Sequence, residues 1–350
     1  MRVGLRALVV ALVLTQGAVA ASGAAIDHHA SGAYYIALGD SYSSGEGLVP
    51  YLTADSGCNR SSQSYPEIVR AELDFSRFRF LACSGATTAQ VNAQVAALSP
   101  VVLRDAALTT LTAGGDDLPF AGLIAACLGA GLAGSPEIHF VAGVGGVAQC
   151  DSAITAAAAL LGASFDPASG SVTLPSSALQ VPLSTPSTLQ VRLGVLYDRI
   201  IRAEDIVKSS KTGPKIIVLQ YPTLLSDNGP GNCLAGSQTI NFPSNPLYNG
   251  LHPVFSSLST TALVALNSDL QQETAVVVAT LRHEGYLGVS IATPHDFVPL
   301  DCQTGVSADL TGLLGAADST SVAPGSFHPT AAGQLVFAQT AVSAWINAVR

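Results

Sequence analysis

Short apolar runs that end at turn residues alternate with helix-like segments, and this alternation constrains the fold more than any other feature of the chain. The expected strands are residues 33–38, 78–82, 107–112, 215–220 and 287–292. The expected helices, in which apolar residues recur at helical spacing, are residues 66–73, 87–98, 188–207, 258–283 and 329–349. Strands separated by helices form right-handed βαβ units. The sequence therefore predicts an α/β fold with a mainly parallel five-stranded sheet and helices on both of its faces.

Three stretches interrupt this alternation. Residues 118–134 are apolar but broken by Pro119 and by glycines, and we expect a buried helix with its flanks there rather than a membrane span. Residues 151–186 mix an Ala-rich helix with segments rich in Pro, Ser and Gly, and residues 227–253 contain Gly, Asn and Pro throughout. We expect both to be loop insertions over the carboxyl edge of the sheet. No internal repeat is visible, so we expect residues 33–350 to form one domain.

The first residues have the pattern of a secretion signal. Arg2 and Arg6 precede an apolar run at 7–14, and Ala18 and Ala20 supply the small residues of a cleavage site. A membrane span needs about 20 apolar residues, and this run is less than half as long. We therefore expect residues 1–20 to be a signal peptide. The mature protein is then secreted and extracellular, with no stable membrane anchor.

Six cysteines agree with export, because disulfides persist outside the cytoplasm. None of them forms a C-x-x-C pair, so a zinc ribbon or a thioredoxin-type redox site finds no support. Six cysteines allow many pairings, and the sequence alone does not choose among them. Sequential pairing is the simplest, and it gives Cys58–Cys83, Cys127–Cys150 and Cys233–Cys302.

The composition excludes two classes of protein. Charged residues make up 11% of the chain, hydrophobic residues 48%, and the formal net charge is −9. Intrinsic disorder needs low hydrophobicity, and nucleic-acid binding needs a basic surface. The acidic balance also argues against an anionic membrane surface as a partner. Metal motifs such as H-E-x-x-H are absent, so we expect neither a metal nor a cofactor.

Small and polar residues follow the first three expected strands at their carboxyl ends. Open parallel sheets bind ligands at this edge, so the side chains are expected to converge on one site. A fourth segment of the same kind precedes the last expected helix. The four segments are residues 39–47 (GDSYSSGEG), 82–87 (ACSGAT), 114–117 (GGDD) and 326–334 (SFHPTAAGQ).

In order and spacing these segments resemble the four sequence blocks of the SGNH (GDSL-type) hydrolases. Residues 58–62 (CNRSS) and the pair Tyr65-Pro66 also resemble the secreted actinobacterial lipase/esterase branch, which has three disulfides. The resemblance runs from about Tyr34 to the C-terminus, and the two insertions match only loosely. It implies a three-layer α/β/α sandwich of the flavodoxin-like type.

By this resemblance Ser41 is the nucleophile and His328 is the general base. A serine hydroxyl is a poor nucleophile unless a base with a pKa near neutrality assists it, and histidine is such a base. The other histidines are not surrounded by a matching block, and we expect them near the cleavage point, at the surface or in the core. They are His28, His29, His139, His252, His283 and His295.

The group that orients His328 departs from the family pattern. The family often has an aspartate three residues before the histidine, where this sequence has Gly325. A main-chain carbonyl can also fix the tautomer of the imidazole and support its cation. We therefore expect the main-chain oxygen of Gly325 to accept a hydrogen bond from His328. The carboxyl groups of Asp296 and Asp318 are the alternatives.

The oxyanion hole holds the main departure. By resemblance its donors are the N–H groups of Ser41 and Gly85 and a third group at position 116, where the family has an asparagine. Here the residue is Asp116, and an ionised carboxylate has no proton to donate. Either desolvation keeps Asp116 protonated or the enzyme is slow. A loop acid that only caps the next helix is the alternative for Asp116. We expect Asp117 to have a structural role, as a helix or loop cap.

The sequence thus predicts a secreted serine ester hydrolase, a lipase or esterase that could include phospholipase-type activity, with a Ser-His acyl-enzyme mechanism. The expected substrate is a small-molecule or lipid acyl ester, because the insertions are apolar and aromatic residues make up only 6% of the chain. We expect a monomer. The alternatives are a carbohydrate O-deacetylase and a nearly inactive binding protein on the same fold.

Overall fold

The structure is a computed structural model of the chain, and it describes residues 32–52, 57–131, 147–226, 232–237, 252–312 and 325–350. Its central sheet has five parallel strands in the order β10-β7-β3-β1-β2. The strands are β1 (Tyr34–Gly39), β2 (Arg77–Phe80), β3 (Ala106–Thr112), β7 (Lys215–Leu219) and β10 (Val289–Ala292). All five predicted strands are present. The second ends two residues earlier than expected and the fifth begins two residues later.

The order of the strands determines where a ligand can bind. The chain begins near the middle of the sheet at β1, moves outward to β2 and then returns past β1 to β3. The connections therefore leave β1 and β3 in opposite directions, which opens a crevice at the carboxyl ends of these two strands. The segments 39–47 and 114–117 follow these two strands directly.

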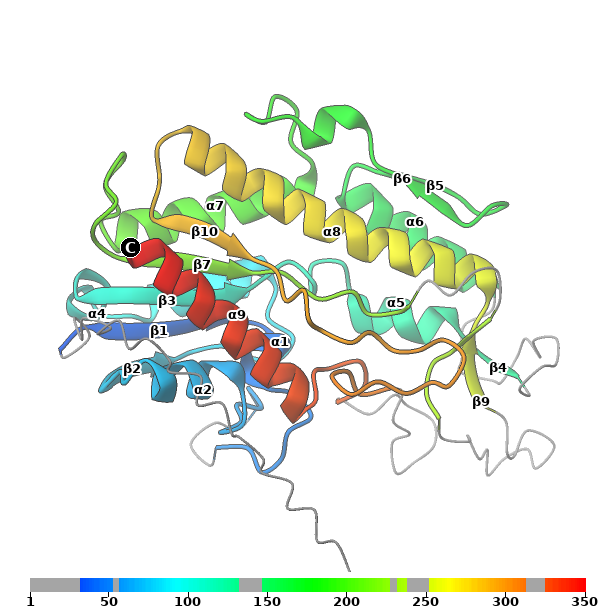
Figure 1. Cartoon of the computed structure of the whole chain (residues 1–350). Coiled ribbons are helices and arrows are strands. Elements are labelled where there is room, and N and C mark those ends of the chain that lie inside the picture. The colour runs from blue at the N-terminus through cyan, green and yellow to red at the C-terminus, as the bar shows by residue number, and fades with distance from the viewer. Residues whose placement is uncertain (1–31, 53–56, 132–146, 227–231, 238–251, 313–324) are drawn as a thin grey trace, which may run out of the picture.

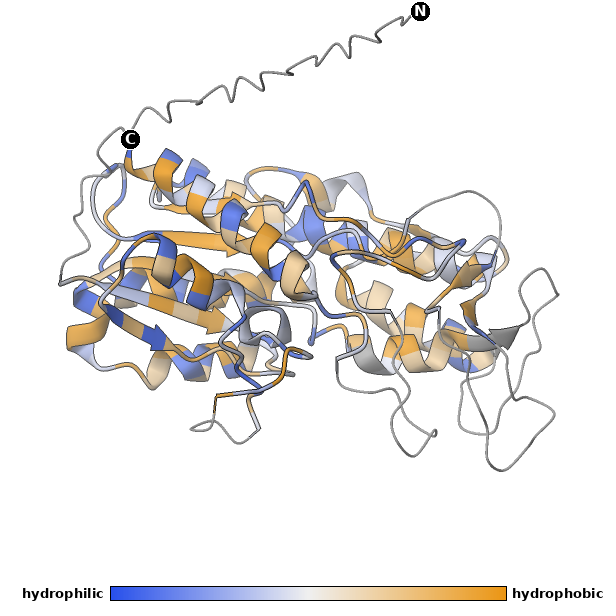
Figure 2. Ribbon diagram, turned by 60° about the horizontal axis from the view of Figure 1, so that its bottom comes forward, coloured by the Kyte–Doolittle hydropathy of each residue, from blue (hydrophilic) through white to orange (hydrophobic). Residues whose placement is uncertain are grey.

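Helices cover both faces of the sheet, as predicted (Figure 1). One face carries α2 (Tyr65–Glu72) and α9 (Ala331–Val349), which pack against each other. The other face carries α3 (Thr88–Ala96), α7 (Thr188–Ala203) and α8 (Ser257–His283). A short helix that was not predicted, α4 (Pro100–Arg104), precedes β3. The strands between the two layers are mostly hydrophobic in Figure 2, and β7 is buried along its whole length.

The insertions lie beyond the carboxyl ends of the strands (Figure 1). Between β3 and α7 the chain forms α5 (Phe120–Cys127), β4 (Leu128–Gly131), α6 (Val147–Leu160), the hairpin β5–β6 (Ser164–Asp166 and Ser171–Thr173) and the 3-10 helix η1 (Ser176–Leu179). The strands β8 (Cys233–Leu234) and β9 (His252–Phe255) form a small antiparallel sheet with β4. Most of residues 227–253 lie outside the described part of the chain.

The segment 118–134 corrects one prediction. A helix is present, but it ends at Cys127, and the chain continues as strand β4 rather than as a flank of that helix. Two glycines in β4 disfavour a longer helix, and the antiparallel partner β9 satisfies the backbone groups of this segment. Whether residues 33–350 fold as one domain stays a prediction.

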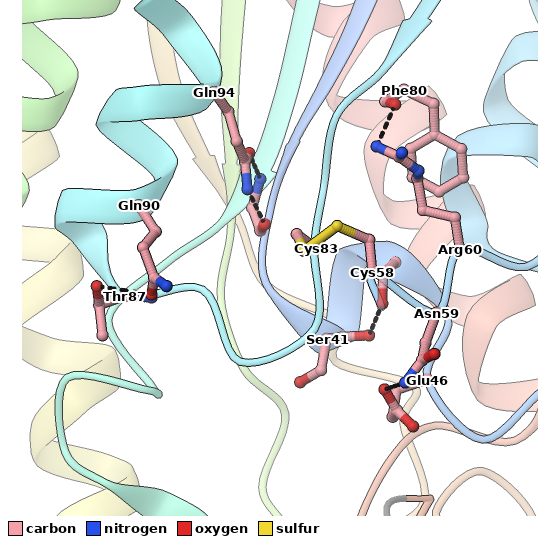
Figure 3. Close-up of a disulfide and its surroundings, with 12 residues drawn as sticks. Ser41, Glu46, Cys58, Asn59, Arg60, Phe80, Cys83, Thr87, Gln90 and Gln94 are labelled. Carbon is pink, nitrogen blue, oxygen red and sulfur yellow. Dashed lines mark hydrogen bonds between the residues drawn. A yellow bond between two sulfur atoms is a disulfide. The ribbon is translucent and has the colours of Figure 1, made fainter. Parts of the chain in front are cut away.

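Three disulfides join the six cysteines, and they follow the sequential pairing: Cys58–Cys83, Cys127–Cys150 and Cys233–Cys302. The second joins α5 to α6 and the third joins β8 to the segment after β10, so both stabilise the insertions. The first lies beside Ser41 (Figure 3). None of the helices in the described ranges is both long enough and apolar enough to cross a membrane.

Candidate active site

Ser41 begins the short helix α1 (Ser41–Ser44), immediately after β1. The turn needs Gly39, which has a φ of +119°, because a Cβ there would lie 2.5 Å from the carbonyl oxygen of Thr112. The side chain of Gln94 holds both backbone groups of Gly39, with distances of 2.9 and 2.8 Å (Figure 3). Asp40 caps α1 by accepting a hydrogen bond from the N–H of Tyr42 at 3.1 Å. These contacts fix the serine at the edge of the sheet.

His328 lies in the turn before α9, and a main-chain carbonyl orients its ring. Nδ1 lies 2.9 Å from the carbonyl oxygen of Ser326. The carbonyl is therefore not that of Gly325, as the sequence had suggested, but that of the next residue. Phe327 has a φ of +58°, and this left-handed turn directs the Ser326 carbonyl back toward the ring. Because a carbonyl only accepts, Nδ1 carries the proton and Nε2 keeps the lone pair that a general base needs.

Tyr42 ties the histidine turn to the serine turn. Its hydroxyl donates a hydrogen bond to the carbonyl oxygen of Phe327 at 2.7 Å, and its ring centroid lies 5.4 Å from that of His328. Burial lowers the pKa of His328, while the nearby Glu46 carboxylate and the Ser326 carbonyl act in the opposite direction. The imidazole is therefore kept neutral near pH 7, as a base must be.

The two remaining segments bring Gly85 and Asp116 to the same place. Gly85 has a φ of +76° and is exposed. Asp116 is half-buried, and burial is the main reason that its pKa is raised to about 7, with further contributions from the charges of Asp40 and Asp117. At neutral pH a large fraction of Asp116 is therefore protonated and able to donate a hydrogen bond.

Asp117 has the capping role that the sequence predicted. Its carboxylate accepts hydrogen bonds from the N–H and the hydroxyl of Thr88 at 2.8 and 3.0 Å, at the first turn of α3. Arg192 of α7 forms an ion pair with the same carboxylate at 2.9 Å. Asp117 thus joins α3 and α7 to the loop after β3, and these contacts hold the backbone of this loop next to Asp116 in place.

Tyr221 is a site residue that the sequence analysis missed. Its hydroxyl donates a hydrogen bond to Asp40 and accepts one from the N–H of Gly115 at 2.9 Å. A Cβ on Gly115 would lie 2.9 Å from the Tyr221 ring, so only glycine allows this contact. Thr112 donates a further hydrogen bond to Asp40 at 2.6 Å. Tyr221 follows β7 by two residues, so the same carboxyl-edge rule that selected Ser41 could have found it.

A cavity of about 210 Å³ brings the predicted residues together. Ser41, Gly85, Asp116 and His328 all line it. Most of the remaining lining is apolar and comes from the loop after β3, from α5, from the segment after β7 and from α8. These apolar residues are Leu118, Phe120, Leu123, Leu224, Leu263, Leu266 and Leu270.

Other candidates from the sequence lie elsewhere. Asp296 is exposed and lines a separate groove beside α9, so the structure does not bring it to His328. Asp318 lies outside the described residues. The same is true of His28, His29 and His139, and the cavity lining includes none of His252, His283 and His295. Among the described residues, no three His, Cys, Asp or Glu side chains gather in a way that could hold a metal ion.

Comparisons with known proteins agree with this geometry. Residues 37–336 match the model of the GDSL-like Lipase/Acylhydrolase family. A "Lipase" of Streptomyces rimosus is 44% identical over 93 residues, which are 27% of this chain and 34% of the relative. "Lipase 1" of Streptomyces coelicolor is 40% identical over 121 residues, which are 33% of this chain and 43% of the relative. The aligned regions thus span less than half of these relatives.

Solved structures show the same fold at lower identity. A phospholipase A1 from Streptomyces albidoflavus has a TM-score of 0.58 at 23% identity, covering 91% of this chain and 100% of that chain. An extracellular lipase from Streptomyces rimosus has a TM-score of 0.56 at 22% identity, covering 91% and 100%. These similarities confirm the predicted α/β/α sandwich and the resemblance to the actinobacterial lipases.

Proposed function

The chain belongs to the GDSL-like lipase/acylhydrolase family, and from this premise we propose that it is a secreted serine ester hydrolase that cleaves acyl esters. The observation that carries the proposal is a single cavity that Ser41, Gly85 and His328 line together with mostly apolar side chains. The curated relatives called lipases support it.

The mechanism that we propose uses the chain's own residues. Ser41 Oγ attacks the ester carbonyl while Nε2 of His328 takes its proton. The negative charge on the carbonyl oxygen is stabilised by the N–H groups of Ser41 and Gly85 and by protonated Asp116. Collapse of this intermediate expels the alcohol, which takes the proton from His328. A water molecule then cleaves the acyl-serine by the same steps in reverse.

The lining of the cavity supports an acyl chain as the bound group. Leu118 and Leu123 line one part of it, and Leu263, Leu266 and Leu270 of α8 line another. Apolar side chains with a few polar groups at the reacting end are typical of sites that bind an apolar chain. This favours a lipid-type ester over an acetylated sugar. Because a phospholipase A1 has a similar fold, phospholipids are among the substrates that should be tested.

Secretion is part of the proposal. It rests on the signal-like pattern of residues 1–20, on three disulfides and on the extracellular lipase of similar fold. Detection of the protein in the culture medium with a new N-terminus after residue 20 would test this part.

The activity is tested with p-nitrophenyl esters of increasing chain length and with a serine-reactive phosphonate. We expect hydrolysis of acyl esters and covalent labelling of Ser41, and the Ser41→Ala variant should show neither. Hydrolysis of acetyl esters alone would support the deacetylase, and no hydrolysis of any ester would support the binding protein. Labelling of another serine would refute the assignment of the nucleophile.

A further inference from the structure

Glu46 places a carboxylate in the proposed active site that the mechanism above does not use. It follows α1 by two residues, its exposed fraction is 2%, and it lines the same cavity as Ser41 and His328. Figure 3 shows it close to Ser41 and to the disulfide Cys58–Cys83. A carboxylate buried at such a place needs compensation for the loss of water.

Two hydrogen bonds hold this carboxylate in one position. Tyr51 donates from its hydroxyl to Oε1 at 3.2 Å, and Asn59 donates from Nδ2 to Oε2 at 2.8 Å. Asn59 follows Cys58 in the chain, so the disulfide to Cys83 anchors one of the two donors. Both donors are neutral amide or phenol groups. They fix the direction of the carboxylate without neutralising its charge.

The segment that carries Glu46 packs directly on the turn that carries His328. A Cβ on Gly47 would lie 3.1 Å from the Cα of Gly325, so the two main chains touch at this point. Position 325 is where the sequence lacks a family acid. The negative charge near the histidine turn is therefore the Glu46 carboxylate, which belongs to the segment after Ser41, and not a side chain at position 325.

We propose that Glu46 is a positioning residue that stabilises the cationic form of His328 during catalysis, in place of the acid absent at position 325. When His328 takes the proton of Ser41 Oγ, its ring becomes a cation beside a fixed carboxylate. The proton stays on His328 until the leaving alcohol takes it, and no proton passes to Glu46 in this step. This inference rests on the proposed function, since it assigns a role within that reaction.

Several other titratable groups face the same cavity. They are the carboxyl groups of Asp40 and Asp116 and the phenols of Tyr42 and Tyr221, and Tyr42 lies against the His328 ring. Their presence means that the test must change the charge at Glu46 alone. Glu46→Gln does this, because the glutamine amide keeps a similar shape and its oxygen can still accept a hydrogen bond from Asn59.

The matched control is Tyr51→Phe. It removes one hydrogen bond from Glu46 and one from Gly47, whose N–H donates to the Tyr51 hydroxyl at 3.0 Å, but it leaves the negative charge in place. The first measurement is the pKa of His328, which is determined by NMR titration in the Ser41→Ala background. The His328→Ala variant identifies the signal of this histidine. This measurement needs no catalytic activity, so it stands even if the protein hydrolyses no ester.

We expect Glu46→Gln to lower the pKa of His328 by about one unit, because an opposite charge nearby favours the charged form. In the active enzyme the acidic limb of kcat/KM should move down by a similar amount. One pKa unit corresponds to a tenfold change in equilibrium, so kcat should fall by up to about tenfold while KM changes little. Tyr51→Phe should leave the limb in place.

Two results would overturn the inference. An unchanged pKa of His328 in Glu46→Gln shows that the carboxylate does not act on the ring. Equal shifts in Glu46→Gln and Tyr51→Phe show that packing, and not charge, is responsible. If Glu46→Gln does not fold, Glu46→Asp, which keeps the charge, is compared with Glu46→Ala. If the pKa of His328 is close to its wild-type value in Glu46→Asp but not in Glu46→Ala, the result supports a role for the negative charge. If Glu46→Asp does not restore that pKa, the result refutes the role.

Discussion

Replacement of Asp116 by asparagine should make the enzyme faster, although it changes a residue of the active site. Asp116 lies where an oxyanion donor is expected, and it can donate only when protonated. Burial, together with the charges of Asp40 and Asp117, raises its pKa to about 7. An asparagine at this position carries an amide that donates at every pH. The gain should therefore depend on pH and be largest where Asp116 is ionised.

The size of the gain follows from the protonated fraction. With the pKa of Asp116 at about 7, half of the molecules have the donor at pH 7 and about one in ten has it at pH 8. If the protonated acid and the amide stabilise the oxyanion equally, Asp116→Asn raises kcat about twofold near pH 7 and about tenfold near pH 8. The upper limit is the worth of one oxyanion donor, about 100- to 1000-fold.

The assay is the rate of ester hydrolysis by pH-stat titration across about pH 5 to 9. The wild-type profile should be bell-shaped, with an acidic limb from His328 and an alkaline limb from Asp116. Because the charges of Asp40 and Asp117 help to raise the pKa of Asp116, the position of the alkaline limb depends on both neighbours. Asp116→Asn should remove this limb. Asp198→Asn, on the outer side of α7 in an ion pair with Arg202, is the control and should keep it.

Two outcomes would refute this reasoning. If kcat falls in Asp116→Asn at every pH, the carboxylate has a role that an amide cannot perform. If the rate rises but the alkaline limb stays, another group sets that limb and Asp116 is not the titrating donor.

The remaining predictions concern the base, its orientation and the core. Ser41→Ala and His328→Ala should each abolish hydrolysis, and the double variant should lose little more than either alone, because the two residues act as a unit; additive losses would contradict this. Asp296→Asn should change kcat by less than about tenfold, whereas a loss near 10⁴ would show that Asp296 completes a triad. Burial raises the pKa of Glu204 to about 8, so its stabilising contribution is present below the pKa of unfolded glutamate and is lost as the pH rises to about 8. Glu204→Gln, which can still accept the hydrogen bond from Thr109, should raise the free energy of unfolding by about 1–3 kcal/mol near pH 8 and change it little near pH 4. Denaturant unfolding at both values checks this, and an equal effect at both would refute it.

The central fold could be predicted because its signals are local. Most of the strands are short apolar runs, and the helices have their own periodicity and in several cases a cap, as in α7, where Ser187 and Gln190 form a capping box. The small sheet β4-β9-β8 could not be predicted in this way. Its strands are two to four residues long, and the pairing of β4 with β9 joins segments more than 100 positions apart. In addition, β4 lies in an apolar stretch that also suits a helix.

Within the candidate site, the residues at the ends of strands and in the four blocks were accessible from the sequence. The predicted acceptor for His328 was wrong by one residue. The left-handed φ of Phe327 determines which carbonyl faces the ring, and the sequence gives little sign of this conformation. Tyr221 follows a strand and Glu46 lies in the first block, so their positions were accessible too, but their contacts were not. These contacts are with Gly115 and with the histidine turn, which lie far away along the chain.

Burial in the cavity acts on both the proposed base and the proposed oxyanion donor. It disfavours the charged form of each, so it lowers the pKa of His328 and raises that of Asp116 to about 7. The proposed mechanism needs both groups neutral at once: His328 as a base with a free lone pair, and Asp116 as an acid with a proton. Because burial moves the two pKa values apart, a pH range opens in which this neutral pair is populated. The Glu46 carboxylate narrows this pH range at its acidic end, because it favours the cation of His328 and so raises the pKa of that residue. Glu46→Gln should therefore widen the active range toward low pH and reduce the maximal rate, whereas Asp116→Asn should widen it toward high pH and raise the rate.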